Sequence, residues 1–457
     1  MSTQGVYNVD AVAGILGGYG KKRIDIALAA DSNAVFATNT GHFQGGQKAI
    51  SNLIGKPYSV GVRPIKRLGG FASIFHNVNH YTSNLSSSSP LPSYFEDYEL
   101  DSGLGIDDWL TAPSYYLNDG SNLSSGQIAN IFQLLTGDEM FDANLALSFH
   151  LNVGTFASGT AARYQPGIRK MNTTNYVIQD TEQDSVTGTD GIIDYSLAIP
   201  AGDRASGGLQ FVLNPVAATS LEGPFYASFT NVEFTQRTAG VSYHLSMYQG
   251  GHSSYDCCRA MKATPIKAIA EYLRTLVKLQ NGTKQLIFQI IHGGNDRYEI
   301  GLSWNHTTQD FDQEISSTAK GFANNIDGIR KYITDAWESL KYDKANLAFL
   351  VGAYHPIGVD MTIGGITKPS TQWLSNYYDE VIDRGHPDTC VIKGEELTTV
   401  AVMEANGEYA NTSSYAHLTQ VGYENHGTRW VSALLSAAAE SNAKRGLPVF
   451  GNHHVFS

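Results

Sequence analysis

A strongly apolar run in the second half of the chain predicts a buried strand, Gln285-Leu286-Ile287-Phe288-Gln289-Ile290-Ile291. Helical patterns flank this run at about 265–279 and 319–340. Further strands are predicted at 24–30, 241–248, 347–351 and 389–392, and further helices at about 44–53, 371–384 and 419–442. Because strands that alternate with helices form mostly parallel sheets, this pattern predicts a three-layer α/β fold.

The region between about residues 66 and 240 has a different pattern. The chain before it predicts a β-α-β unit, whose second strand covers 58–65. The region itself contains short alternating runs broken by Gly, Asn, Asp and Pro, which predict strands at 145–153, 176–179, 192–199, 209–213 and 225–234, with one short helix near 127–135. We therefore expect an α/β domain of residues 1–65 and 241–457. A mostly-β domain of residues 66–240, a β-sandwich or jelly roll suited to carbohydrate binding, interrupts it.

Composition narrows the class of partner. The chain has 457 residues, a formal charge of −12 and only 16% charged residues. No basic cluster is longer than Lys21-Lys22-Arg23, which argues against binding to nucleic acid. The chain contains no run of 18 apolar residues, so no membrane span is predicted. The N-terminus lacks the charged region that a signal peptide would have. A cytoplasmic or virion-associated location fits these features, with virion or homo-oligomer partners left open.

The number and spacing of the cysteines predict neither a set of disulfide bonds nor a metal site. The three cysteines are Cys257, Cys258 and Cys390, an odd count with one adjacent pair. Neither a paired Cys-x-x-Cys pattern nor His-Glu-x-x-His occurs. We therefore expect buried thiols, no structural metal and no cofactor.

Four short patches carry the residue types of acyl-transfer chemistry. In chain order they are Ala30-Asp31-Ser32-Asn33, Gly251-His252-Ser253-Ser254, Gly293-Gly294-Asn295-Asp296 and Ala416-His417-Leu418-Thr419. The first three follow predicted strands, and the last precedes the closing helix with Thr419 as a candidate cap. Taken alone, the first and third patches are better explained as a turn or a helix cap, and the second can be a loop. Together they supply a hydroxyl nucleophile, a backbone N–H, an amide and an imidazole, which can attack an ester and hold its oxyanion.

The ordered patches resemble the blocks of the SGNH (GDSL-type) esterase/lipase family. The resemblance implies that Ser32 is the nucleophile and His417 the base. It also implies that the Ser32 N–H, the Gly251 N–H and the Asn295 side chain form the oxyanion hole. Asp31 and Asp296 occupy the acidic positions of the family pattern, for which the resemblance implies structural and not catalytic roles. Two departures from the family pattern are Ala30 in place of Gly and Ser414 in place of the acid three residues before His417.

Several alternatives remain open at this point. Without the acid, a backbone carbonyl or Glu408 would assist His417. A literal Asp-x-x-His occurs at Asp383 to His386, but it precedes the last predicted strand, so we favour His417 as the base. A pair of carboxylates acting as in glycosidases is a further possibility.

The resemblance favours a carboxylic-ester hydrolase. Its substrate would be an acylated glycan from which it removes O-acetyl groups, or another small ester. The competing interpretation is a virion structural or receptor-binding protein. Such a protein would keep an SGNH-like scaffold with weak or no catalysis, and the low charge and Ser414 fit it.

Overall fold

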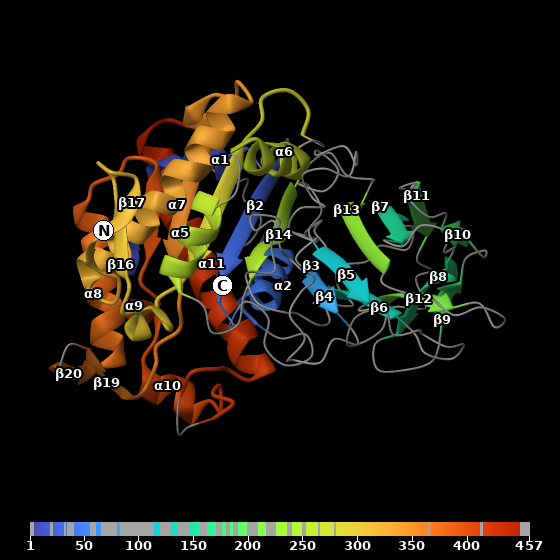
Figure 1. Cartoon of the computed structure of the whole chain (residues 1–457). Helices are drawn as coiled ribbons and strands as arrows, with labels where there is room; N and C mark the ends of the chain where they lie inside the picture. Colours follow the sequence, from blue (N-terminus) through green and yellow to red (C-terminus); the bar gives the residue numbers. More distant parts are fainter. Residues whose placement is uncertain are drawn as a thin grey trace. The chain divides into compact units, whose positions relative to one another are not determined.

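The computed structural model describes residues 4–18, 22–31, 33, 41–54, 61–64, 80–82, 114–118, 129–135, 146–155, 162–170, 176–179, 183–185, 191–198, 209–215, 225–234, 240–248, 253–263, 266–277, 280–363, 366–411 and 415–447. The chain divides into two compact units (Figure 1). The first comprises Met1–Tyr58 and Arg237–Ser457, and the second comprises Ser59–Gln236.

The first unit is built on a mainly parallel sheet. Its strand order is β1-β21-β18-β15-β2-β14, with β1 Val6–Tyr7, β21 Thr389–Ile392, β18 Leu347–Gly352, β15 Leu286–Ile291, β2 Arg23–Ala30 and β14 Gly240–Tyr248. Neighbouring strands are parallel except for β1, which is antiparallel to β21. The predicted α/β fold with a parallel sheet is therefore confirmed.

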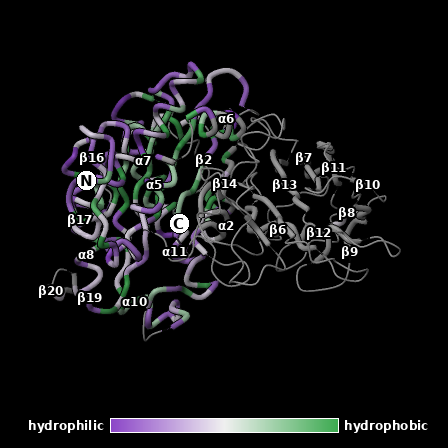
Figure 2. The backbone as a smooth tube through the Cα atoms, in the orientation of Figure 1, coloured by the Kyte–Doolittle hydropathy of each residue, from purple (hydrophilic) through white to green (hydrophobic). Residues whose placement is uncertain are grey.

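Helices pack in two groups against this sheet. One group contains α1 Asp10–Leu16, α2 His42–Ile54 and α11 Gln420–Lys444. The other contains α5 Ser254–Ala263, α6 Ile266–Val277, α7 Ala319–Ser339 and α8 Ser370–Asp383. Every residue of β2, β15, β18 and β21 is buried, as expected of parallel strands covered on both faces. The apolar centre of this unit is visible in Figure 2.

The order of the strands marks where a site belongs. From β2 the chain reaches β14 on one side of β2 and then returns to β15 on the other side. The chain therefore changes direction between β2 and β15. In open α/β sheets, ligands bind outside the carboxyl ends of the strands at such a switch point.

Two sequence predictions are wrong in this region. The strand expected at 58–65 exists as β3 Gly61–Pro64, but it pairs with β6 of the second unit and not with the parallel sheet. The β-α-β opening is therefore wrong, because the parallel partner of β2 along this edge is β14. The short helix expected near 127–135 is strand β6 Ala129–Leu135. A short apolar run does not distinguish a strand from a helix, or one strand partner from another.

Within the second unit, the described strands form two sheets. One has the order β10-β8-β12-β6-β3 with β9 on β8, and the other has the order β11-β7-β13-β5-β4. Their bounds are β4 His80–Thr82, β5 Ser114–Asn118, β7 Ala146–Thr155, β8 Ala162–Lys170, β9 Tyr176–Gln179, β10 Gln183–Ser185, β11 Gly191–Ala198, β12 Leu209–Pro215 and β13 Phe225–Phe234. The five strands expected here are confirmed, whereas the sandwich or jelly roll stays a prediction.

The first unit also contains smaller elements. They are the hairpins β16 Leu302–Asn305 with β17 Asp310–Ile315 and β19 Asp360–Ile363 with β20 Ile366–Pro369, the short helices α9 Gly394–Leu397 and α10 Val400–Ala405, and the 3-10 turns η3 Asp296–Tyr298 and η4 Lys344–Asn346. The three cysteines are free and buried, as expected. Among the described helices, none combines the length and the apolar character needed to cross a membrane.

Candidate active site

Two of the four sequence patches meet at the switch point of the sheet. Asp31 directly follows β2, and Asn295 lies four residues after the end of β15. The Asn295 Nδ2 donates a hydrogen bond to Asp31 Oδ2 at 3.3 Å. Ser32 and Gly251, the predicted nucleophile and oxyanion glycine, lie outside the described residues. The residues beside Ser32 therefore locate its patch at this edge of the sheet.

A buried hydrogen-bond network surrounds Asp31. Its Oδ1 accepts bonds from the backbone N–H of Asn33 at 2.8 Å and from Asn33 Nδ2 at 3.2 Å. Tyr354, two residues beyond β18, donates from its hydroxyl to Asp31 Oδ2 at 3.0 Å and accepts from Asn33 Nδ2 at 2.6 Å. Tyr423, on α11, donates to Asn33 Oδ1 at 2.6 Å. Segments from three strand ends and one helix thus converge on the residues beside Ser32.

Burial controls the charge of the acidic residues in this site. The pKa of Asp31 is raised to about 6, chiefly by desolvation, while bonds from Asn33 and Tyr354 and the charge of Arg297 act against the rise. The pKa of Asp296 is raised to about 7 by the same cause, and nearby Glu299 and Asp31 add to it. The ionised form of both carboxyl groups is therefore less stable, relative to the protonated form, than it is in water.

Asp296 connects the third patch to the second. Its Oδ1 accepts hydrogen bonds from the backbone N–H of Ser254, at 3.0 Å, and from the Ser254 hydroxyl. Ser254 is the first residue of α5 and the last residue of the patch that begins at Gly251. Three of the four patches therefore meet through described contacts, although Gly251 itself is not described.

His417 lies just before the N-terminus of α11. The predicted cap is confirmed, because the Thr419 side chain accepts a bond from Gly422 N at 3.1 Å. Tyr415, two residues before His417, has a φ of +50°, a strained backbone for a bulky residue and one that is often found at functional sites. Desolvation lowers the pKa of the half-buried His417 imidazole. A lowered pKa keeps this ring in the neutral form that a general base requires.

The fourth patch also reaches the strand ends. Desolvation is the main cause that lowers the pKa of both His42 and His355, and the nearby His417 imidazole adds to it. His355 follows Tyr354 directly, and their rings stack with centroids 5.0 Å apart. His417 is therefore a neighbour of the same group of residues that contains Tyr354.

Glu408, the carboxylate expected to assist His417, is engaged in other contacts. Glu408 is buried and receives two bonds of 2.6 Å from Arg429, with further bonds from Asn406 and Asn425 at 3.1 Å each. This pairing lowers the pKa of Glu408 and uses both of its oxygens. Ser414 lies outside the described residues.

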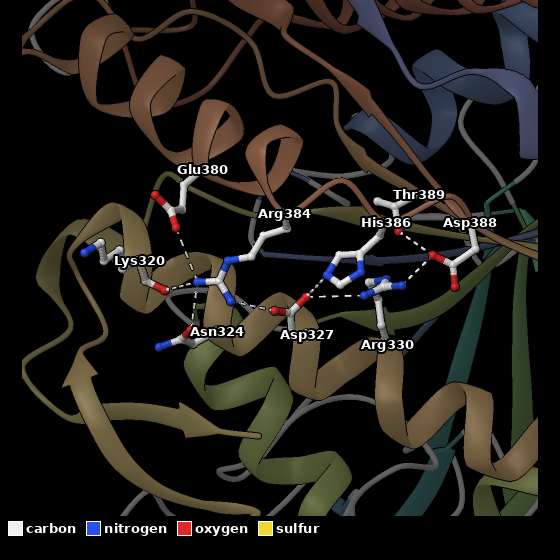
Figure 3. Close-up of polar contacts among 9 residues, drawn as sticks. All are labelled: Lys320, Asn324, Asp327, Arg330, Glu380, Arg384, His386, Asp388 and Thr389. Atoms are coloured by element: carbon white, nitrogen blue, oxygen red, sulfur yellow. Dashed lines mark hydrogen bonds and ion pairs between the residues drawn. The ribbon is translucent and has the colours of Figure 1, made fainter. Parts of the chain in front are cut away.

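His386 belongs to an ion-pair network at the other end of the sheet (Figure 3). Its Nε2 lies 2.8 Å from Asp327 Oδ1 on α7, and Asp327 also pairs with Arg330 and Arg384. His386 precedes β21, so it lies at the amino end of a strand, whereas Asp31 and Asn295 follow the carboxyl ends of theirs. The alternative base is therefore placed away from the other patches.

Sequence reasoning missed a cluster of buried histidines beside the Asp31 network. His42 Nε2 lies 3.4 Å from His355 Nδ1, and the ring of His426 lies 5.5 Å from that of His42 between centroids. Desolvation lowers the pKa of all three, that of His426 to about 4. Within the described part of the chain, no group of three His, Cys, Asp or Glu side chains is arranged to hold a metal ion.

Comparisons with known proteins find likenesses in structure but not in sequence. No family model and no curated protein matches the chain. Among solved structures, it is similar to a peptidoglycan O-acetylesterase, with 11% identity over 95% of this chain and 97% of that chain and a TM-score of 0.46. It is also similar to a salicylyl-acyltransferase from a tetracycline biosynthetic pathway, with 11% identity over 67% and 82% of the two chains and a TM-score of 0.22.

A further similar structure is a family two carbohydrate esterase from Cellvibrio japonicus, with 8% identity over 69% and 95% of the two chains and a TM-score of 0.23. The fold of the first unit is α/β with a mainly parallel sheet, as the resemblance to the SGNH family implies.

Proposed function

We propose that this protein is a serine esterase of SGNH type, a carboxylic-ester hydrolase whose nucleophile is Ser32. The observation that supports this most strongly is the hydrogen bond between Asn295 and Asp31, residues 264 positions apart in the chain. It joins the first and third patches at the switch point between β2 and β15, where α/β sheets bind ligands.

The proposed reaction needs a base, a nucleophile and donors to the oxyanion. Neutral His417 accepts the proton of the Ser32 hydroxyl while the oxygen attacks the ester carbonyl. The Asn295 amide, with the backbone N–H groups of Ser32 and Gly251, stabilises the negative charge that develops on the carbonyl oxygen. His417 then gives its proton to the leaving alcohol, and water hydrolyses the acyl-enzyme by the same steps in reverse.

We propose an O-acetyl group on a carbohydrate as the substrate. This choice follows the family resemblance, and the low content of charged residues, 16%, is compatible with a glycan as partner. A role for the second unit, Ser59–Gln236, in binding the glycan is part of the same proposal.

Hydrolysis of p-nitrophenyl acetate by the wild type and by Ser32→Ala tests the nucleophile. We expect the variant to lose activity by roughly 10³-fold or more, because no other group replaces the attacking oxygen. Circular dichroism and a thermal melt would verify that the fold is intact. Equal activity in both proteins, or none in either, would contradict the proposal and favour a binding or structural protein.

A pair of histidine variants tests the base. His417→Ala should lose roughly 10²–10⁴-fold in kcat, the usual contribution of a general base. His386→Ala is the matched control and should keep its activity, since Asp327 still pairs with Arg330 and Arg384. Loss of activity in His386→Ala but not in His417→Ala, with both proteins folded, would reverse the assignment.

A further inference from the structure

The two residues that flank Ser32 are fixed to each other. Asp31 and Asn33 are both buried, and the Asp31 carboxylate accepts bonds from the backbone and from the side chain of Asn33. A carboxylate that bonds the N–H two residues ahead restrains the short segment between them. Any group that holds both residues therefore also restrains the position from which Ser32 extends.

Tyr354 forms hydrogen bonds to both of these residues. Its hydroxyl accepts from Asn33 Nδ2 at 2.6 Å and donates to Asp31 Oδ2 at 3.0 Å. Desolvation raises the pKa of this hydroxyl well above 10, so it keeps the proton that it donates. Tyr354 reaches the site from a loop in which Ala353 has a φ of +65°, a conformation that costs energy for a residue with a side chain.

The third patch leaves space for this hydroxyl. A Cβ atom added to Gly294 would lie 2.1 Å from Tyr354 Oη, too close for any side chain unless the tyrosine moved. The absence of a side chain at Gly294 thus allows Tyr354 to reach Asp31 and Asn33. This close approach gives the second glycine of Gly293-Gly294-Asn295-Asp296 a physical role.

We propose that Tyr354 is a positioning residue for the nucleophile, because its hydroxyl joins Asp31 to Asn33 and so holds the segment that carries Ser32. This inference rests on the proposed esterase function. Tyr354 does not touch the ester in this scheme and acts only through the two residues beside Ser32.

The bond from Tyr354 also affects the charge of Asp31. Among the described residues, the polar and charged groups facing Asp31 are Asn33, Asn295, Asp296, Arg297, Tyr354, Tyr378 and Tyr423. Among them, the Tyr354 hydroxyl lowers the pKa of Asp31 from what burial alone would give. Its removal should raise that pKa above about 6, so that Asp31 loses its charge, and part of its capacity to accept bonds, at a higher pH.

Tyr354→Phe removes only the hydroxyl, and Tyr243→Phe is its matched control. Tyr243 is also fully buried, and its hydroxyl donates to Gln289 Oε1 at 2.7 Å within the sheet, away from Asp31 and Asn33. With p-nitrophenyl acetate, Tyr354→Phe should lower kcat by about 10–100-fold, the cost of a slightly misplaced reacting group, with KM within about twofold. The acid limb of its pH–kcat profile should move to higher pH. Tyr243→Phe should keep the wild-type kcat and profile.

The outcomes separate the two proposals. If Ser32→Ala is inactive but Tyr354→Phe matches Tyr243→Phe in kcat and acid limb, the positioning role is overturned and the esterase stands. If Ser32→Ala keeps full activity, the esterase proposal fails and the positioning role fails with it. Should Tyr354→Phe not fold, Gly294→Ala keeps the hydroxyl but displaces it, and a wild-type kcat in that variant would overturn the inference.

Discussion

The buried histidines beside the site determine how it responds to acid. His42, His355 and His426 are fully buried, and each has a pKa below the usual 6.5 because burial disfavours the charged ring. His426 Nε2 also contacts the carbonyl oxygen of Ala353 at 2.9 Å, next to Tyr354. Protonation of these rings would place positive charge beside the Asp31 network.

His426 provides a measurable effect on stability. Its pKa is about 4 in the folded chain and near 6.5 when exposed, so the unfolded state binds a proton first as the pH falls. The stability that neutral His426 provides is therefore complete above pH 6.5 and is lost progressively toward pH 4. Between pH 7 and pH 5, the wild type should lose about 2 kcal/mol more unfolding free energy than His426→Gln. Urea unfolding at both pH values measures this difference, and equal losses would contradict the assigned pKa.

At the residue scale, the sequence singled out Asn295 and His417 from their positions after a strand and before a helix, in an order that resembles a known family. Their roles stay predictions, and the structure shows the Asn295 side chain bonded to Asp31. Tyr354 and His355 were open to the same reasoning, because they lie three and four residues after the strand predicted at 347–351. Tyr423 and His426 were not, since their role depends on how α11 packs and not on local sequence.

At the scale of elements, the close contact of α2 with α11 holds several site residues in place. A Cβ on Gly427 would lie 2.2 Å from the carbonyl oxygen of Gly45, and one on Gly45 would lie 2.2 Å from that of Tyr423. The two helices therefore touch through their backbones. This approach places His42, the first residue of α2, against Tyr423 and His426 of α11.

Gly427→Ala tests this contact, and Gly14→Ala is the matched control. Gly427→Ala should destabilise the protein by about 1–3 kcal/mol or more, because the added methyl meets backbone that cannot rotate away. Gly14 lies in helix α1, where, within the described part of the chain, a methyl group would meet just the end of the Arg445 side chain at 3.4 Å. Gly14→Ala should therefore stabilise by about 0.5–1 kcal/mol through helix propensity. Denaturant unfolding measures both, and equal shifts would show that the helices can separate without cost.

Elements were predicted most accurately where the hydrophobic periodicity and the length of the segment indicated the same type of element. The strand at 389–392 and the helices α7 and α8 lie within one or two residues of their expected bounds. The hairpins β16–β17 and β19–β20 were missed. In β17 every residue is exposed or half-buried, so burial imposes no alternating pattern on its sequence. The strand partner of β3 was also unpredictable, because pairing depends on distant segments.

At the scale of the whole molecule, the parallel sheet draws on two separate parts of the chain. Its strands come from Val6 to Ala30 and from Gly240 to Ile392, with the unit Ser59–Gln236 between them. The change in periodicity near residues 66 and 240 led to the predicted division into two domains, which stays a prediction. The arrangement of strands in the second unit was not visible in the sequence, because short strands of similar pattern can pair in many orders.

Replacing residues 59–236 with a short Gly/Ser linker tests whether the second unit serves the substrate. We expect the remaining chain to fold, because all six strands of the parallel sheet and their covering helices are retained. It should hydrolyse p-nitrophenyl acetate at a rate close to that of the full chain but lose activity on an O-acetylated polysaccharide. Equal loss on both esters in a folded protein would contradict a role confined to glycan binding.

The place of β2 in the sheet also has a consequence for the order in which the protein is made. All eight residues of β2 are buried, and its parallel neighbours begin only at Gly240 and Leu286. At about 5–20 residues per second, the ribosome needs roughly 10–40 s to add the 200 or so residues that separate β2 from its first partner. This wholly buried strand is thus synthesised well before the strands that pair with it. Until then, the nascent chain exposes a segment that favours aggregation and benefits from a chaperone.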